Sequence, residues 1–202
     1  MSPATTTTSS SEAIASSSSG DYSGLVINEI DYDQPGEDSG EFVEIRNNGA
    51  QTLNLAPVRL VFADADGVAD DLGLYDHSLA PGQLLVAGTA SLLAKVTGAA
   101  EKVELPVPAD EIVNTGPAAV SLFTVHGATA TLLDAVSYGG SVTSVEYLGS
   151  MFKLVEGNAT LVVDGEAAAG SLVRLPDGKD SNDNKTDWSL SKNPTPGAPN
   201  KP

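Results

Sequence analysis

The sequence predicts an all-β domain, built as a sandwich or a barrel of short strands. Val, Ile, Thr, Tyr and Phe gather in short runs, and clusters of Gly, Pro, Asn and Asp separate these runs. No long stretch repeats its apolar residues at the 3.6-residue period of a helix. The chain has 202 residues and no cysteine, so it is long enough to bury a core and does so without disulfides.

The first strands expected are residues 25–32 and 41–47, joined by an acidic Pro- and Gly-containing loop at 33–40. This loop carries the residue types that break strands and reverse the chain, so the two strands are predicted to pair antiparallel. The segment is rich in carboxylates, namely Glu29, Asp31, Asp33, Glu37, Asp38, Glu41 and Glu44.

Three polar residues, Asn28, Glu29 and Glu44, fall on these strands rather than in the loop. Burying a carboxylate without a partner is very costly. We therefore expect them to be hydrogen-bonded to the backbone, or to Arg46 or Arg59, with catalysis as the alternative.

The later elements follow from the same signals. Residues 84–87 are apolar throughout, which indicates a strand covered on both faces, and residues 90–95 form the one helix-like segment, with Thr89 as its cap. Gly127 sits where a hairpin needs a positive φ. The remaining strand candidates are 58–62, 72–75, 101–105, 120–125, 131–138, 144–148, 152–155, 160–164 and 172–175.

The domain organisation predicted is a disordered leader at 1–24 and one domain at 25–202. The leader consists mostly of Ser, Thr, Ala and Gly, which bury too little apolar area to offset the entropy of ordering. It is either a flexible tether or an idle terminus. Residues 194–202 are too rich in Pro to pair centrally, so they either pack across a sheet or leave the domain.

The formal net charge is −17, from 27 acidic and 10 basic residues. Nucleic-acid binding depends on Lys and Arg that displace counterions, so this balance argues against DNA or RNA as a partner. It fits cation binding, a high-salt habitat or a well-solvated surface. No stretch approaches the roughly 20 apolar residues of a membrane span, so no membrane insertion is expected.

Short motifs in matching order resemble bacterial lamin tail domains from about Leu25 to Asn200. The opening of the resemblance is Ile27-Asn28-Glu29-Ile30, followed by Glu41-Phe42-Val43-Glu44-Ile45 and Asn47. Its middle is Leu79-Ala80-Pro81-Gly82-Gln83, then Leu84-Leu85-Val86-Ala87, then Asp134-Ala135-Val136-Ser137-Tyr138. Its end is Ser171-Leu172-Val173-Arg174-Leu175-Pro176-Asp177-Gly178, then Asp187-Trp188, then Thr195-Pro196-Gly197-Ala198-Pro199-Asn200.

The resemblance implies an immunoglobulin-like β-sandwich of mostly antiparallel strands. It also implies a non-catalytic interaction or anchoring module, with a protein partner or a cell-surface component. Bacterial members often stand beside nucleases, phosphatases or adhesive modules, which implies an exported, extracellular or cell-surface location. The family motifs are turns and strands, so the resemblance supplies no catalytic residue and no certain cofactor.

A calcium-dependent adhesive or structural domain is the first alternative. Calcium takes six to eight oxygen ligands, which Asp, Asn and backbone carbonyls on a loop supply. The best candidates are Asp177, Asp180, Asn182, Asn184 and Asp187. Lys185 and Ser191 stand where an EF-hand needs Gly and Glu, so this is no EF-hand, and an Asx-rich turn that bonds its own backbone explains the same residues.

Two further acidic loops are weaker calcium candidates. The first comprises Asp31, Asp33, Glu37, Asp38 and Glu41. The second comprises Asp64, Asp66, Asp70 and Asp71.

A cryptic hydrolase is the second alternative, because His77 and His126 are available as bases. Two imidazoles are few for a zinc enzyme, and no nucleophile elbow, phosphate-binding loop or HExxH motif occurs. Surface or capping histidines explain both residues. The single tryptophan, Trp188, is expected to close the core with its ring buried and its N–H bonded, with carbohydrate stacking as the alternative.

Overall fold

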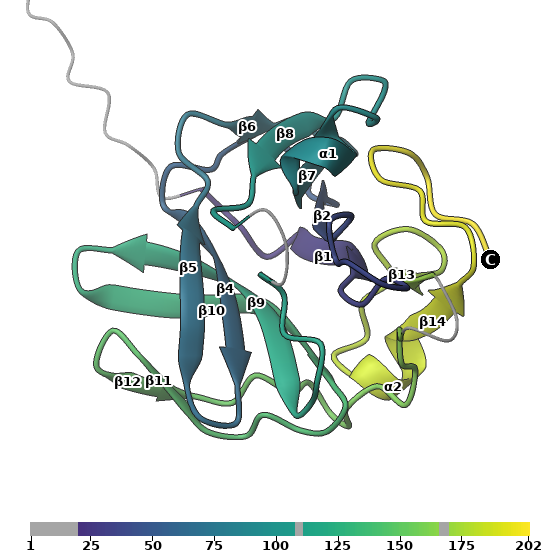
Figure 1. Cartoon of the computed structure of the whole chain (residues 1–202). Coiled ribbons are helices and arrows are strands. Elements are labelled where there is room, and N and C mark those ends of the chain that lie inside the picture. Colours follow the sequence, from purple (N-terminus) through teal and green to yellow (C-terminus); the bar gives the residue numbers. More distant parts are fainter. Residues whose placement is uncertain (1–19, 108–110, 166–169) are drawn as a thin grey trace, which may run out of the picture.

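The computed structural model describes residues 20–107, 111–165 and 170–202, and strands dominate this part of the chain (Figure 1). The strands are β1 (Leu25–Asp31), β2 (Phe42–Asn47), β3 (Leu53–Asn54), β4 (Val58–Asp64), β5 (Val68–Gly73), β6 (Ser78–Leu79), β7 (Leu84–Gly88), β8 (Glu101–Glu104), β9 (Ala118–His126), β10 (Thr129–Tyr138), β11 (Val145–Tyr147), β12 (Ser150–Phe152), β13 (Ser171–Arg174) and β14 (Trp188–Ser191). The helices are α1 (Ala90–Leu93) and α2 (Asn184–Asp187).

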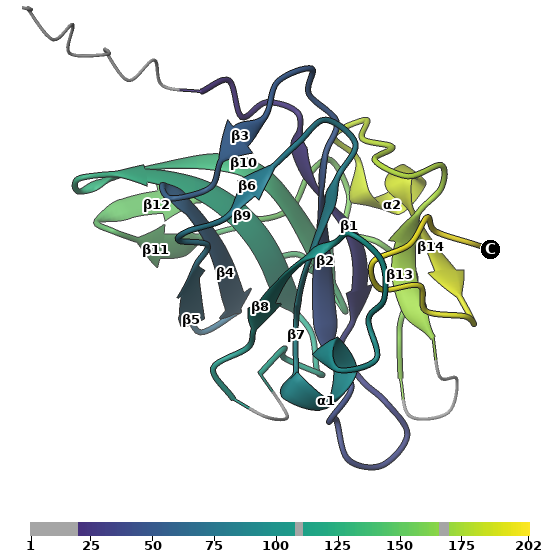
Figure 2. The ribbon, with the colours of Figure 1, turned by 90° about the horizontal axis from the view of Figure 1, so that it is seen from above.

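Two main sheets form the layers of a sandwich (Figure 2). One has the order β14-β13-β1-β2-β7-β8 and the other β10-β9-β4-β5. Every pairing is antiparallel except that of β7 with β8. The expected antiparallel pair of β1 and β2 is confirmed, with a bulge between Ile27 and Glu29. The predicted all-β, mostly antiparallel sandwich is therefore confirmed.

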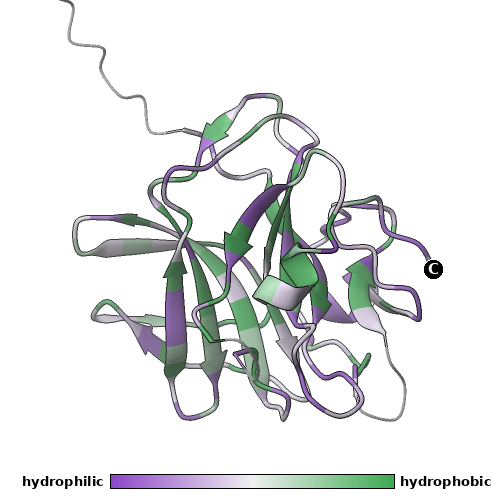
Figure 3. Ribbon diagram, turned by 45° about the horizontal axis from the view of Figure 1, so that its top comes forward, coloured by the Kyte–Doolittle hydropathy of each residue, from purple (hydrophilic) through white to green (hydrophobic). Residues whose placement is uncertain are grey.

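The core lies between the two sheets, where apolar side chains from the strands of both layers form one buried cluster. Ile27, Val43, Leu60 and Val120 contribute to it from both layers. Figure 3 shows hydrophobic residues on strands of both sheets. A second cluster, which includes Phe123 and the β11 residue Tyr147, fills the space between the outer face of the four-stranded sheet and the β11–β12 hairpin. Both faces of that sheet are thus covered.

Several local predictions hold. All five residues of β7 are buried, as its apolar run predicts. Thr89 caps α1 by accepting from the N–H of Leu92, and Gly127 takes a φ of 63° in the β9–β10 hairpin. Residues 194–200, here called the C-terminal strap, pack across the six-stranded sheet through bonds described below.

Three predictions are wrong in position. Residues 160–164 form no strand; their N–H groups instead bond outside any ladder, from Thr160 to Ser137 O and from Asp164 to Tyr32 Oη. The strand expected at 72–75 begins earlier, at Val68, because an edge strand tolerates acidic side chains in its interior. The strand expected at 152–155 lies earlier, as β12, Ser150–Phe152.

The last residues of the predicted leader contact the domain. Tyr22 packs against the core and its hydroxyl donates to Asn54 O at 2.7 Å, so residues 20–24 belong to the folded part. The rest of the leader, residues 1–19, lies outside the described residues. Within the described residues, no helix has the length and apolar character needed to cross a bilayer.

Candidate functional site

A buried arginine, Arg174 at the end of β13, occupies the centre of the most highly charged part of the interior. Its side chain is fully buried. Its Nε donates to Ile27 O at 2.8 Å, and its Nη1 donates to Lys179 O at 2.6 Å. The guanidinium also lies over the Trp188 ring, 4.9 Å from the ring centroid. These contacts fix the cation between the two layers.

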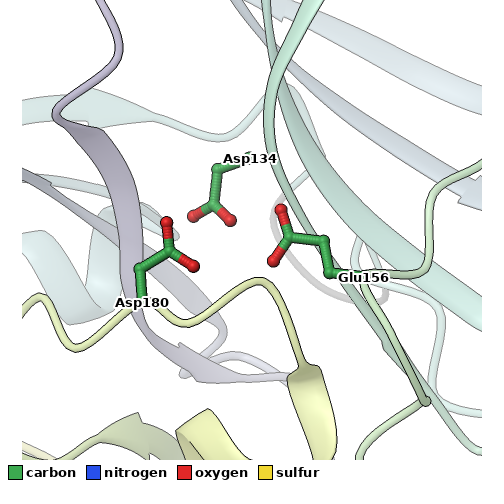
Figure 4. A group of neighbouring side chains, drawn as sticks. All are labelled: Asp134, Glu156 and Asp180. Atoms are coloured by element: carbon green, nitrogen blue, oxygen red, sulfur yellow. The ribbon is translucent and has the colours of Figure 1, made fainter.

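Four carboxylates surround this guanidinium. Arg174 pairs with Asp134 at 2.8 Å, with Asp180 and Asp187 at 3.4 Å each, and with Glu156 at 3.9 Å. Ligand atoms of Asp134, Glu156 and Asp180 all lie within 4.8 Å of one another. Figure 4 shows these three side chains pointing toward one another from β10, from the segment after β12 and from the loop before α2.

The pKa values of this cluster follow first from burial and then from its unequal charges. The pKa of Glu156 is raised to about 8, mainly by burial and also by the charges of Asp134 and Asp180, while Arg174 acts to lower it. Burial also raises the pKa of Asp134, although Arg174 opposes this. Burial acts to raise the pKa of Asp187, but bonds from Ser181 and the charge of Arg174 hold it below its usual value.

The five residues predicted to bind calcium are not brought together as one set. Asp180 belongs to the converging group of carboxylates, and the Asn184 amide contacts that group by donating to Glu156 at 3.4 Å. Asp177 accepts from the N–H of Asn200 at 2.8 Å, and Asn182 takes a left-handed φ of 57°. The loop bonds its own backbone, since Asp180 accepts from Asn182 N at 3.1 Å and Asp187 accepts from Ser181 N at 2.8 Å. This is the Asx-bonded turn expected as the alternative, while calcium binding stays a prediction.

Asn184 has a structural role that the sequence did not reveal. Its side chain is buried beside β10, donates to Ala135 O at 2.9 Å and accepts from Ser137 N at 3.1 Å. The amide thus makes the two hydrogen bonds that a neighbouring strand would make. It covers the edge of β10 over these residues.

A second polar centre lies on the outer face of the six-stranded sheet, under the C-terminal strap. Glu29 and Glu44 are paired across β1 and β2, and both are fully buried. Glu29 accepts from Thr195 N at 2.9 Å, and Glu44 accepts from Gly197 N at 2.7 Å. Asn28 donates to Glu44 at 2.8 Å. The prediction that these residues bond to the backbone is confirmed. The two glutamates accept from backbone N–H groups of the strap rather than from Arg46 or Arg59.

Burial under the strap raises the pKa of both glutamates. It raises that of Glu44 to about 8, against the hydrogen bonds from Asn28 and Gly197 and with a further contribution from Glu29 and Asp177. It also raises the pKa of Glu29, against the bonds from Ser171 and Thr195. Because Glu44 is desolvated and Glu29 lies beside it, its pKa of about 8 favours the protonated form at neutral pH.

The acidic loop between β1 and β2 holds a neighbouring loop in place. Glu41 accepts from the N–H groups of Glu111 at 2.9 Å and Ile112 at 3.2 Å, and Asp38 accepts from the Asn114 amide. Asp31 accepts from the Gln34 amide at 2.5 Å. These bonds account for much of the carboxylate density at the start of the domain.

The histidines and the tryptophan take positions without converging polar partners. His77 Nδ1 lies 3.2 Å from Glu101, and His126 is exposed at the end of β9. Neither lines the ≈ 380 Å³ cavity beside β3 or the ≈ 490 Å³ groove beside β10. The Trp188 ring is buried as expected, but its N–H has no hydrogen-bond partner in the described part of the chain, so that half of the prediction is wrong.

A comparison with known families matches residues 18–148 to the Lamin Tail Domain. This chain belongs to the lamin tail domain family. It has an immunoglobulin-like fold, and the family is non-enzymatic. No curated protein matches the chain significantly.

The fold explains the motifs that resemble lamin tails, of which those up to residue 148 lie inside the family match. Ile27-Asn28-Glu29-Ile30 supplies the bulge and the acceptor Glu29. Thr195-Pro196-Gly197-Ala198-Pro199-Asn200, which lies beyond the matched residues, supplies the donors to Glu29 and Glu44. Asn200 Nδ2 donates to Asn28 O and to Arg174 O, at 3.0 Å each. The motifs farthest apart in the sequence are therefore bonded to one another and hold the domain together.

Proposed function

We propose that this lamin tail domain is a non-catalytic interaction or anchoring module that holds a partner protein or a cell-surface component. One observation carries the proposal: three of the most deeply buried acids, Glu29, Glu44 and Asp134, are committed to main-chain donors. Glu29, Glu44 and Asp134 each accept from at least one backbone N–H. Such groups stabilise a rigid scaffold, and we expect a surface of this scaffold, rather than a cleft, to bind the partner.

We place the module in an exported or surface-associated bacterial protein. The resemblance to bacterial lamin tails, which stand beside exported enzymes and adhesive modules, supports this location. The charge of −17 supports a basic or neutral partner, since like charges across an interface disfavour binding.

The proposal is tested by quantifying the retention of the purified chain on cell envelopes of its host. Retention that saturates, is competed by unlabelled chain and weakens as salt rises is the expected result. The control is the chain heated and quenched without refolding. Turnover of ester, phosphate or glycoside substrates that His77→Ala abolishes would instead support the hydrolase alternative.

Calcium is a second proposed ligand, because three carboxylates converge on one point and exceed the charge of Arg174. If it binds there, millimolar CaCl₂ raises Tm and a chelator reverses the rise. Asp180→Asn removes this response, whereas Asp66→Asn, an exposed control, retains it. An unchanged Tm at millimolar calcium rejects this ligand.

A further inference from the structure

The four-stranded sheet ends in an edge that the fold covers over only half of its length. In β10, the backbone of Ala135 and Ser137 bonds to the Asn184 side chain, and Thr160 N donates to Ser137 O at 3.2 Å. Thr129–Leu133 form the other half. Apart from β9, no described residue bonds to the backbone of that half.

The uncovered half lacks the features that usually protect an edge strand. Sheet edges are shielded by charge, proline or short length, because open N–H and C=O groups attract other strands. Two other edge strands of the sheets do carry charges: β5 has Asp70 and Asp71, and β8 has Glu101, Lys102 and Glu104. Thr129–Leu133 reads Thr-Ala-Thr-Leu-Leu, which contains neither charge nor proline and favours the extended backbone.

A bulge marks where the covered half ends. The pairing of β10 with β9 shifts between Leu132 and Asp134, and Asp134 then turns inward to Arg174 and Ile27 N. The free half instead continues into the β9–β10 hairpin, which reaches away from the six-stranded sheet (Figure 2).

A groove of ≈ 490 Å³ runs beside this free edge. Thr131, Leu132 and Leu133 line one side of it, and Asp21, Tyr22 and Asp180 lie among its other lining residues. Asp21 and Asp180 are exposed, and no Lys or Arg is found among the described residues that line the groove. The groove thus combines open strand edge, apolar side chains and negative charge.

We propose that the free edge of β10, Thr129–Leu133, binds an extended basic segment of a partner protein as an added antiparallel or parallel strand. Main-chain bonds to the edge supply affinity, and alternate side chains of the segment face the groove. Lys or Arg of the segment meets Asp21 and Asp180, and apolar residues contact Leu132 and Leu133. Five residues of strand span about 17 Å, which is enough for a short recognition motif. This inference rests on the proposed interaction function and names its surface.

The test uses a capped octapeptide of alternating Lys and Val, titrated into the full chain and followed by backbone amide NMR. Shifts concentrated at residues 20–23 and 129–133 are expected. A Glu–Val peptide of the same length, and the Lys–Val peptide with alternate backbone N-methylation, are expected to bind at least tenfold more weakly.

Matched variants test whether the peptide binds at the free edge of β10. Thr131→Lys puts a charge on the exposed face of the free edge and is expected to weaken peptide binding at least fivefold. Ser150→Lys adds the same charge at an exposed position of β12 and leaves binding unchanged. Thermal unfolding of both variants verifies that they are folded, and Asp180→Asn, which leaves the edge intact, is expected to weaken binding about threefold.

Equal binding by Thr131→Lys and Ser150→Lys, or undiminished binding of the N-methylated or Glu–Val peptide, would overturn the proposal. Concentration-dependent dimers that Thr131→Lys abolishes, without peptide binding, would assign the edge to a second copy of the chain. None of these results requires a loss of envelope retention. Failure of the strand-binding proposal is therefore distinguishable from failure of the proposed interaction function.

Discussion

At the scale of single residues, Arg174 has the largest effect expected of any side chain on stability. It is buried among Asp134, Glu156, Asp180 and Asp187. Replacing it leaves Asp134, Glu156 and Asp180 without their cation, while Lys179 still lies 3.7 Å from Asp187. Breaking a buried ion pair costs about 3–5 kcal/mol. Arg174→Met is therefore expected to lower the free energy of unfolding by about that amount in urea titrations.

The control for this prediction is Arg46→Met, since Arg46 forms a part-exposed pair with Asp177 at 3.9 Å. Surface pairs contribute roughly 0–1 kcal/mol. If the two variants lose equal stability, the buried cluster is not held by its central cation. Adding Asp134→Leu to Arg174→Met removes one orphaned charge and is expected to recover part of the loss.

The pKa of Glu44, raised by burial to about 8 from 4.5, makes stability depend on pH. The folded chain retains this proton where the unfolded chain has lost it, so the stabilisation is complete below pH 4.5 and declines as pH rises to about 8. One such group contributes a slope of at most ~1.4 kcal/mol per pH unit.

Glu44→Gln removes that titration, so unfolding free energies measured from pH 5 to pH 8 are expected to fall less steeply. The amide also faces donors from Asn28 and Gly197, which lowers its stability at pH 5. Glu104→Gln, at an exposed position of β8, serves as the control and is expected to keep the wild-type slope. A Glu44→Gln slope equal to wild type would mean that this carboxyl is ionised throughout.

At the scale of elements, the C-terminal strap connects neighbouring strands of the six-stranded sheet by hydrogen bonds. Asn200 donates from one amide to Asn28 O on β1 and to Arg174 O on β13. Asn200→Ala leaves both carbonyls short of a donor and is expected to cost about 1–3 kcal/mol in chemical unfolding. Lys201→Ala, one residue beyond, is expected to change stability by less than ~0.5 kcal/mol. Similar values for the two variants would show that the strap adds little.

The sequence predicted those elements whose signal is local. The apolar run of β7, the Thr89 cap and the turn at Gly127 depend on neighbouring residues alone, and all three were found where expected. Strand β14 and helix α2 were missed, because four-residue elements have no period to detect and depend on partners far along the chain.

Of the two buried polar centres, only the one around Glu29 and Glu44 was predicted, because the other depends on residues far apart in the sequence. Glu29 and Glu44 stood out as acids on strands, and the cost of burying them correctly implied backbone partners. Arg174 and Asp134 were not singled out, although each is a lone charge inside an apolar run, which is a signal of a buried pair. Their mutual distance of 2.8 Å comes from sheet topology, which the sequence pattern does not contain.

At the scale of the whole molecule, the charge of −17 opposes the compact state through self-repulsion. Salt shortens the reach of that repulsion, since the Debye length falls from about 10 Å at 0.1 M to about 3 Å at 1 M. Lower pH acts in the same direction, because it neutralises carboxylates. If screening this repulsion raises the free energy of unfolding by roughly 1–2 kcal/mol, Tm rises by ~2–8 °C for a chain of this size.

We therefore expect 1 M NaCl to raise Tm at pH 8 by that amount and to raise it less at about pH 4, close to the ordinary pKa of exposed carboxyl groups. A variant with exposed acids replaced by their amides separates charge from other salt effects. Suitable positions are Asp66, Asp76, Glu104 and Glu146. This variant should show a higher Tm in low salt at pH 8 and a smaller response to NaCl. A response equal to wild type would assign the salt effect to apolar burial, and the acidic surface would then serve solubility or partner choice rather than limit stability.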